Sequence, residues 1–125
     1  MTRTVKYFDE LDLRWDKGEW LVLHEIGVLW LDGYKTLAWF RVAAGWHTDL
    51  ASIPSLVPGF LFPQSGAHNL PAVVHDWTYE DNVPGMSRAD ADLLFLDGMA
   101  AQGVPWLRRR LMYRAVRVAG SSLWG

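Results

Sequence analysis

The sequence contains no cysteine, and after Asp97 it contains no acidic residue. The lack of cysteine excludes disulfides, thiolate metal sites and cysteine nucleophiles, as in proteins that fold in a reducing cytoplasm. Long apolar runs are also missing, because proline, glycine or charge interrupts each one. The first residues lack the apolar stretch of a signal peptide. We therefore expect a cytoplasmic protein without a transmembrane segment.

The remaining composition is that of a folded domain. The chain has 125 residues, of which 50% are hydrophobic and 21% charged, so disorder driven by composition is excluded. This length suffices for one hydrophobic core and indicates a single domain over residues 1–125. The eight tryptophans either fill that core or mark a partner surface, and we favour the core.

Strand patterns occupy the first part of the chain, over about residues 4–49. Residues 21–31 predict two strands or one bulged strand. Asp32-Gly33 is a hairpin signal because both residues tolerate positive φ, and residues 35–42 alternate as the returning strand. Three prolines then predict a loop over about residues 51–70.

Helical patterns occupy the second part, over about residues 71–81, 88–102 and 105–119. Ser87 is a good N-cap, and Asp90 three residues later completes an acidic capping box. Gly103 ends the second helix. The predicted fold class is α+β, with an N-terminal antiparallel hairpin or sheet region followed by three C-terminal helices.

The polar centre of this prediction is His75-Asp76-x-x-Tyr79 together with Asp92. His75 and Tyr79 share a helix face, and a short loop makes the next helix an antiparallel neighbour that brings Asp92 opposite His75. A carboxylate that holds one imidazole nitrogen leaves the other free as a base toward water. Asp76 is a candidate cation ligand and Tyr79 a donor to a carboxylate. A closed structural network of the same residues is the alternative.

A second candidate lies in Trp46-His47-Thr48-Asp49 and the residues that follow it. Asp49 can form an Asx turn or act as a further metal ligand. Ser52 could serve as a nucleophile, but no oxyanion-hole signature surrounds it, so a turn is the preferred interpretation. The other histidines lack metal-ligand spacing and are expected at the surface: His24, His47 and His68.

The third predicted helix is basic. Arg110, Arg114 and Arg117 fall on one face, with Arg108 and Arg109 beside it. They form either a solvated face or a surface that binds phosphate, on nucleic acid or lipid headgroups, or an acidic partner. The absence of a nucleic-acid-binding signature disfavours nucleic acid.

Several segments together resemble the DUF1353 family of phage and prophage proteins. The segments that carry the resemblance are residues 44–54, 72–79, 87–88, 91–95 and 112–117, with Gly120 and Trp124. The resemblance implies a phage or prophage origin and a location in the host cytoplasm or in the phage particle. It does not imply an activity.

The His-Asp-x-x-Tyr motif with a later Asp is also similar to the catalytic helices of phospholipase A2. That similarity implies His75 as base, Asp76 as calcium ligand, Asp92 as orienting carboxylate and Tyr79 as its brace. The glycine-rich calcium loop of those enzymes has only a vague counterpart in residues 63–66, and the strand-rich first half has none.

Three functions remain as hypotheses. The first is a hydrolase of a lipid ester, peptidoglycan fragment or peptide, with His75 and Asp92 as the dyad and calcium, magnesium or zinc on Asp76 and Asp49. The second is a structural or assembly component of a phage particle, such as a tail or baseplate protein, that contacts other phage proteins or itself. The third is a binder of a host protein or signalling nucleotide through the arginines.

Overall fold

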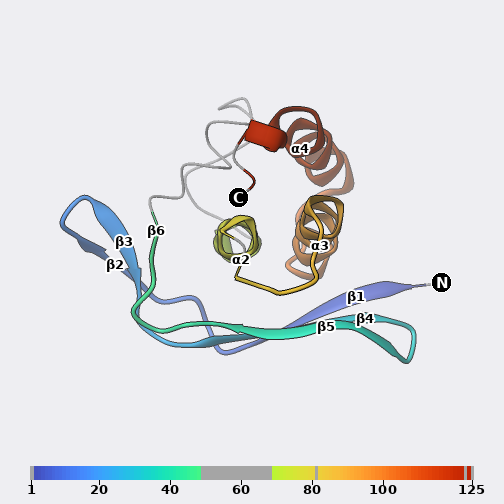
Figure 1. Ribbon diagram of the computed structural model, residues 1–125. Helices are drawn as coiled ribbons and strands as arrows, with labels where there is room; N and C mark the ends of the chain where they lie inside the picture. Colours follow the sequence, from blue (N-terminus) through green and yellow to red (C-terminus); the bar gives the residue numbers. More distant parts are fainter. Residues whose placement is uncertain (1, 49–68, 81, 123, 125) are drawn as a thin grey trace. The chain divides into compact units, whose positions relative to one another are not determined.

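The chain divides into two compact units, Met1–Asp49 and Leu50–Gly125. The computed structural model describes residues 2–48, 69–80, 82–122 and 124. In these ranges antiparallel sheets form the first unit and three α-helices the second, so the predicted α+β class is confirmed (Figure 1). Among the described residues, no helix is long and apolar enough to span a bilayer.

Two antiparallel sheets of three strands make up the first unit. The first sheet has the order β1-β4-β5, formed by Arg3–Phe8, Ile26–Asp32 and Lys35–Val42. The second has the order β2-β3-β6, formed by Leu13–Asp16, Glu19–Val22 and His47–Thr48. Of the two possibilities predicted for residues 21–31, two separate strands is therefore correct.

The predicted hairpin joins β4 and β5, and its turn is shifted by one residue. Asp32 pairs with Lys35, so the turn residues are Gly33 and Tyr34, and Gly33 adopts a φ of 61°. The pairing shifts between Trp30 and Leu31, which places an irregularity next to the turn.

A second hairpin, between β2 and β3, was not predicted from the sequence. Asp16 pairs with Glu19, and the two turn residues Lys17 and Gly18 have φ values of 53° and 90°. Positive φ at both positions is the geometry of a tight two-residue hairpin turn. A lysine at the first position is a weak signal, because it lacks the local hydrogen bonding of asparagine or aspartate.

The expectation that tryptophan mainly fills the core is wrong. Of the eight tryptophans only Trp30 is buried, while Trp15, Trp39 and Trp106 are exposed. Trp39 packs edge-on against Phe8, and their ring centroids are 5.7 Å apart. Both side chains lie over Gly27, where an added Cβ would be 3.2 Å from each of them. Such pairs cover their apolar faces against each other and keep the indole at the surface.

The second unit contains α2 (Asn69–Tyr79), α3 (Arg88–Ala101), α4 (Trp106–Ala119) and the short 3-10 helix η2 (Gly120–Ser122). The three α-helices begin and end within two residues of the predicted bounds. Asn69 and Leu70 belong to α2, and the rest of the loop predicted over residues 51–70 lies outside the described residues.

Helix α3 has the end signals that the sequence predicted. Ser87 and Asp90 form the complete capping box at its start. At its end Gly103 has a φ of 83°, the Val104 amide donates to the Met99 carbonyl at 2.9 Å, and the Gly103 amide donates to the Ala100 carbonyl at 3.1 Å. This pattern is a Schellman motif, which turns the chain sharply into α4.

Helix α3 packs against both α2 and α4. The buried cluster of the unit draws on all three helices and on the turn before α4: Ala72, Phe95, Met99, Val104, Met112 and Val116. This packing brings one face of each helix toward a common centre, where the polar residues described next are located.

Candidate functional site

Helix α2 is buried along most of its length. Pro71 is tolerated because it lies in the first turn, where the backbone N–H has no helical partner. His75 and Tyr79, four residues apart, lie on the same face, with ring centroids 4.2 Å apart. Both side chains are almost completely enclosed, at 1% and 3% exposure.

Asp92 lies one turn into α3 and is completely buried. Its Oδ1 accepts hydrogen bonds from His75 Nε2 at 2.7 Å and from the Tyr79 hydroxyl at 2.6 Å. Asp92 therefore lies opposite His75, as the sequence predicted, and Tyr79 donates to the same oxygen.

The second oxygen of Asp92 binds two arginines. Oδ2 accepts from Arg117 at 2.9 Å and from Arg88 at 3.4 Å, and these side chains are 34% and 21% exposed. One carboxylate thus joins all three helices, through His75 and Tyr79 of α2, Arg88 of α3 and Arg117 of α4. We call these four residues, together with Asp92, the Asp92 network.

Arg88 also caps the end of α4. Its guanidinium donates to the carbonyl of Val116 at 3.2 Å and to that of Arg117 at 3.3 Å. Carbonyls in the last turn of a helix lack helical partners and carry the negative end of the dipole, so a cation here is favourable. A Cβ on Gly120 would collide with the Tyr79 hydroxyl and lie 3.0 Å from Arg88, so glycine is needed for this close approach.

Burial and hydrogen bonding set the protonation states of the network. Burial by itself would raise the pKa of Asp92, but hydrogen bonds from His75, Tyr79 and Arg117 hold that pKa below its ordinary value. Burial raises the pKa of Tyr79, and the bond to Asp92 adds to this effect. Burial lowers the pKa of His75 more than Asp92 raises it. Asp92 is therefore ionised, Tyr79 protonated and His75 neutral at neutral pH.

These states define the tautomer of His75. Because Asp92 is an ionised acceptor, Nε2 carries the proton, and Nδ1 carries a lone pair. Nδ1 is buried and has no hydrogen-bond partner in the part of the chain that the structure describes. Phe95 packs against the ring at a centroid distance of 4.8 Å. Among the described residues, the arrangement is an imidazole oriented at one nitrogen and unpaired at the other.

The model of one protein family, described as "Protein of unknown function (DUF1353)", matches residues 29–116. The chain belongs to the DUF1353 family. The match contains His75, Tyr79, Arg88 and Asp92 and ends one residue before Arg117. No curated protein and no solved structure matches the chain.

The structure brings together some of the site residues predicted for this DUF1353 chain and separates others. Asp76 follows His75 on α2 and is 5% exposed, whereas Asp49 and Ser52 lie outside the described residues. Within the described ranges no three His, Asp or Glu side chains are grouped so that they could hold a metal ion. The described residues therefore do not test the prediction that Asp76 and Asp49 together bind a cation.

The predicted arginine face of α4 is divided. Arg110 and Arg114 are exposed, whereas Arg117 turns to Asp92. No local pattern placed Arg117 in the polar centre, because the pairing spans 25 residues. Arg88 was also missed, although its position four residues before Asp92 on one helix was an available signal.

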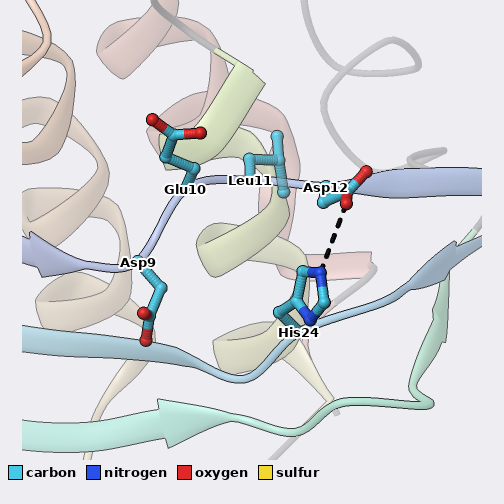
Figure 2. A pocket seen from close by; sticks show the side chains of 5 residues that line it. All are labelled: Asp9, Glu10, Leu11, Asp12 and His24. Carbon is cyan, nitrogen blue, oxygen red and sulfur yellow. Dashed lines mark ion pairs between the residues drawn. The ribbon is translucent and has the colours of Figure 1, made fainter.

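A separate acidic cavity of about 500 Å³ lies in the strand unit, lined by Asp9, Glu10, Leu11, Asp12 and His24. Figure 2 shows the Asp12 carboxylate facing the His24 ring, 3.3 Å away, while the side chains of Asp9 and Glu10 point apart. Asp12 and His24 are both more than half exposed, so water screens their pairing. The diverging carboxylates do not form a ligand set.

Proposed function

We propose that this DUF1353 protein is a small hydrolase in which His75 is the general base and Asp92 orients it. The observation that carries the proposal is the buried Nδ1 of His75, which has no partner among the described residues. A purely structural network would satisfy this nitrogen or use an apolar ring in its place, because an unpaired buried polar group costs about 1–3 kcal/mol.

The proposed step begins at Nδ1. A water O–H bond breaks, its proton moves to Nδ1, and the water oxygen attacks an acyl carbon. When the bond to the leaving group breaks, the same proton passes to that group. The lowered pKa of His75 keeps Nδ1 unprotonated and able to accept this proton at neutral pH.

The charges around Asp92 limit the strength of this base. Two arginines bind the carboxylate, so protonated His75 would add a second net positive charge to a buried cluster. The role left to Asp92 is to orient the imidazole, which is also the role that the phospholipase A2 similarity implies for it. We therefore expect a base suited to reactive acyl groups, and a lipid ester, a peptidoglycan fragment and a peptide all remain candidate substrates.

We also propose that the protein binds a divalent cation. Asp76 and Asp49 are the proposed ligands, but the described residues do not supply a complete set. Calcium, magnesium or zinc should raise the unfolding midpoint of the wild type relative to EDTA, and Asp76→Asn should remove the effect. An unchanged midpoint with all three ions would end the cation proposal and leave the role of His75 in place.

A second candidate function is structural: a tail, baseplate or assembly component of a phage particle. Burial favours this candidate, since the side chains of His75 and Asp92 are both 0% exposed. In that case the Asp92 network holds three helices together, and other surfaces contact phage proteins or a second copy. A phage origin and a location in the host cytoplasm or particle belong to the same proposal.

His75→Gln separates the two candidates. A glutamine amide can still donate to Asp92 from near the Nε2 position, but it has no counterpart of the Nδ1 lone pair. For a hydrolase we expect a free energy of unfolding within about 1 kcal/mol of the wild type and loss of hydrolysis in a panel of acyl esters, peptides and peptidoglycan. His24→Gln, an exposed change in the strand unit, is the matched control and should retain both properties.

The opposite result has two parts. If wild type hydrolyses nothing in the panel and His75→Gln is destabilised by about 3 kcal/mol, the imidazole serves the fold. Hydrolysis that survives in His75→Gln would also refute the assignment of His75 as base, whatever the substrate.

A further inference from the structure

Helix α4 has an apolar and basic surface on the side away from its core. Met112 and Val116 are buried. On the opposite side, residues spaced three or four apart are exposed, and we call them the α4 stripe: Trp106, Leu107, Arg110, Leu111, Arg114 and Val118. The exposed fraction is 59% for Trp106, 62% for Leu107, 40% for Leu111 and 85% for Val118. Single exposed apolar residues are ordinary, but four on one helix side indicate a binding surface.

The stripe carries positive charge from Arg110 and Arg114. Arg110 and Arg114 form no ion pair with another residue in the described ranges. The Arg110 guanidinium lies 5.6 Å from the ring centroid of Trp106, which holds both side chains at the surface. Since no acidic residue follows Asp97, the α4 sequence itself cannot neutralise the stripe.

This chemistry selects among possible partners. A second copy of the stripe would bring like charges together, which disfavours a symmetric dimer through this face. Nucleic acid would satisfy Arg110 and Arg114 but would leave Leu107, Leu111 and Val118 without an apolar partner. An anionic phospholipid surface supplies phosphate for the guanidinium groups and hydrocarbon for the apolar side chains, and tryptophan is favoured at that interface.

We propose that the α4 stripe docks onto the surface of an anionic phospholipid bilayer. The 14 residues of α4 extend over about 21 Å at 1.5 Å per residue, so the stripe offers a linear contact parallel to the membrane plane. The other side of α4 remains packed in the core of its unit, which makes the contact peripheral. The proposal does not depend on the proposed hydrolase activity.

Vesicle co-sedimentation of the full chain tests this proposal. The probes are phosphatidylcholine vesicles with and without about 30% phosphatidylglycerol, in EDTA so that no cation bridges protein and lipid. We expect partition onto the anionic vesicles only. Arg110→Gln/Arg114→Gln should lower the partition coefficient about 30-fold, the effect of two basic contacts of about 1 kcal/mol each at 1.4 kcal/mol per tenfold.

Two further variants separate charge from apolar contact. Leu107→Gln/Leu111→Gln should also weaken partition, although it leaves the net charge unchanged. Lys6→Gln/Lys35→Gln removes the same charge from exposed positions of the strand unit and should bind like the wild type. Circular dichroism should show folded protein for each variant, because every substituted side chain is exposed.

Several results would overturn the proposal. These are equal sedimentation with neutral vesicles, an arginine variant that binds like the wild type, and a leucine variant with unchanged partition. An equal loss in the lysine control would show that only net charge matters. Binding to polyglutamate without binding to anionic vesicles would identify an acidic protein, rather than a membrane, as the partner of the stripe.

Discussion

Asp92→Asn is the substitution that tests the Asp92 network most directly. It keeps the shape of a side chain that is 0% exposed and removes the negative charge of its carboxylate. Four side chains donate hydrogen bonds to that carboxylate. If the amide oxygen faces His75 and Tyr79, the amide NH₂ faces two guanidinium groups, donor against donor. We therefore expect the amide to adopt the opposite orientation, with its oxygen toward Arg88 and Arg117.

The opposite orientation has a consequence for His75. The asparagine NH₂ then points to Nε2, which must become an acceptor, so the imidazole proton moves to Nδ1. Removing one member of a buried charge pair costs about 3–5 kcal/mol, and the partial exposure of both arginines places this case at the lower end. We expect a loss of about 3 kcal/mol, or roughly 10 °C in the unfolding midpoint for a chain of this size.

Urea and thermal unfolding followed by circular dichroism measure the loss, and nitrogen chemical shifts of the His75 ring report the tautomer. The control is Asp90→Asn, which removes the same charge from an exposed position on the same helix and should cost about 0.5–1 kcal/mol through the capping box. A loss below about 1 kcal/mol for Asp92→Asn, with the tautomer unchanged, would refute the view that this carboxylate holds the helices together.

Three further changes test the surroundings of Asp92. Gly120→Ala should lower the free energy of unfolding in urea by about 1–3 kcal/mol, because the new Cβ would collide with the Tyr79 hydroxyl. The control Ser121→Ala should be neutral, and equal stability of the two variants would contradict this packing. Tyr79→Phe should lose about 1–2 kcal/mol in the same assay, and no loss would mean that its hydrogen bond to Asp92 adds nothing. Because the pKa of His75 is lowered in the folded protein, just below about pH 6.5 the imidazole takes up a proton only in the unfolded chain. The free energy of unfolding should therefore decrease as the pH is lowered through this range, by up to about 1.4 kcal/mol per pH unit. His75→Gln should remove that slope, and an identical pH profile for this variant would show that His75 is not its source.

The sequence predicted those parts of the fold that local chemistry determines. The helices of the second unit begin and end within two residues of the predicted bounds, and α3 matches within one residue because Ser87, Asp90 and Gly103 act within one turn of their own backbone. The β4–β5 hairpin followed from Gly33 in the same way. The β2–β3 hairpin was missed because its turn uses Lys17 at positive φ, a conformation that lysine tolerates but does not signal.

The polar centre was predicted only within neighbouring helices. The antiparallel arrangement of α2 and α3 follows from a short loop, and it brings Asp92 to His75 and Tyr79. The position of α4 depends on how the whole core packs, so nothing local indicated that Arg117 reaches the same carboxylate. The basic pattern of α4 suggested a single arginine face, but the fold uses Arg117 inside and leaves Arg110 and Arg114 outside.

The two arginines change how the central motif should be interpreted. A histidine paired with a carboxylate gains basicity from the negative charge, and the sequence predicted such a pair in His75 and Asp92. In the structure, Arg88 and Arg117 offset that charge, while Asp92 still orients the ring through Nε2. Orientation and basicity are thus separated at His75. A catalytic role would depend on the position of Nδ1 more than on its proton affinity, and for this reason His75→Gln, which removes Nδ1 and keeps a donor to Asp92, is the more informative substitution.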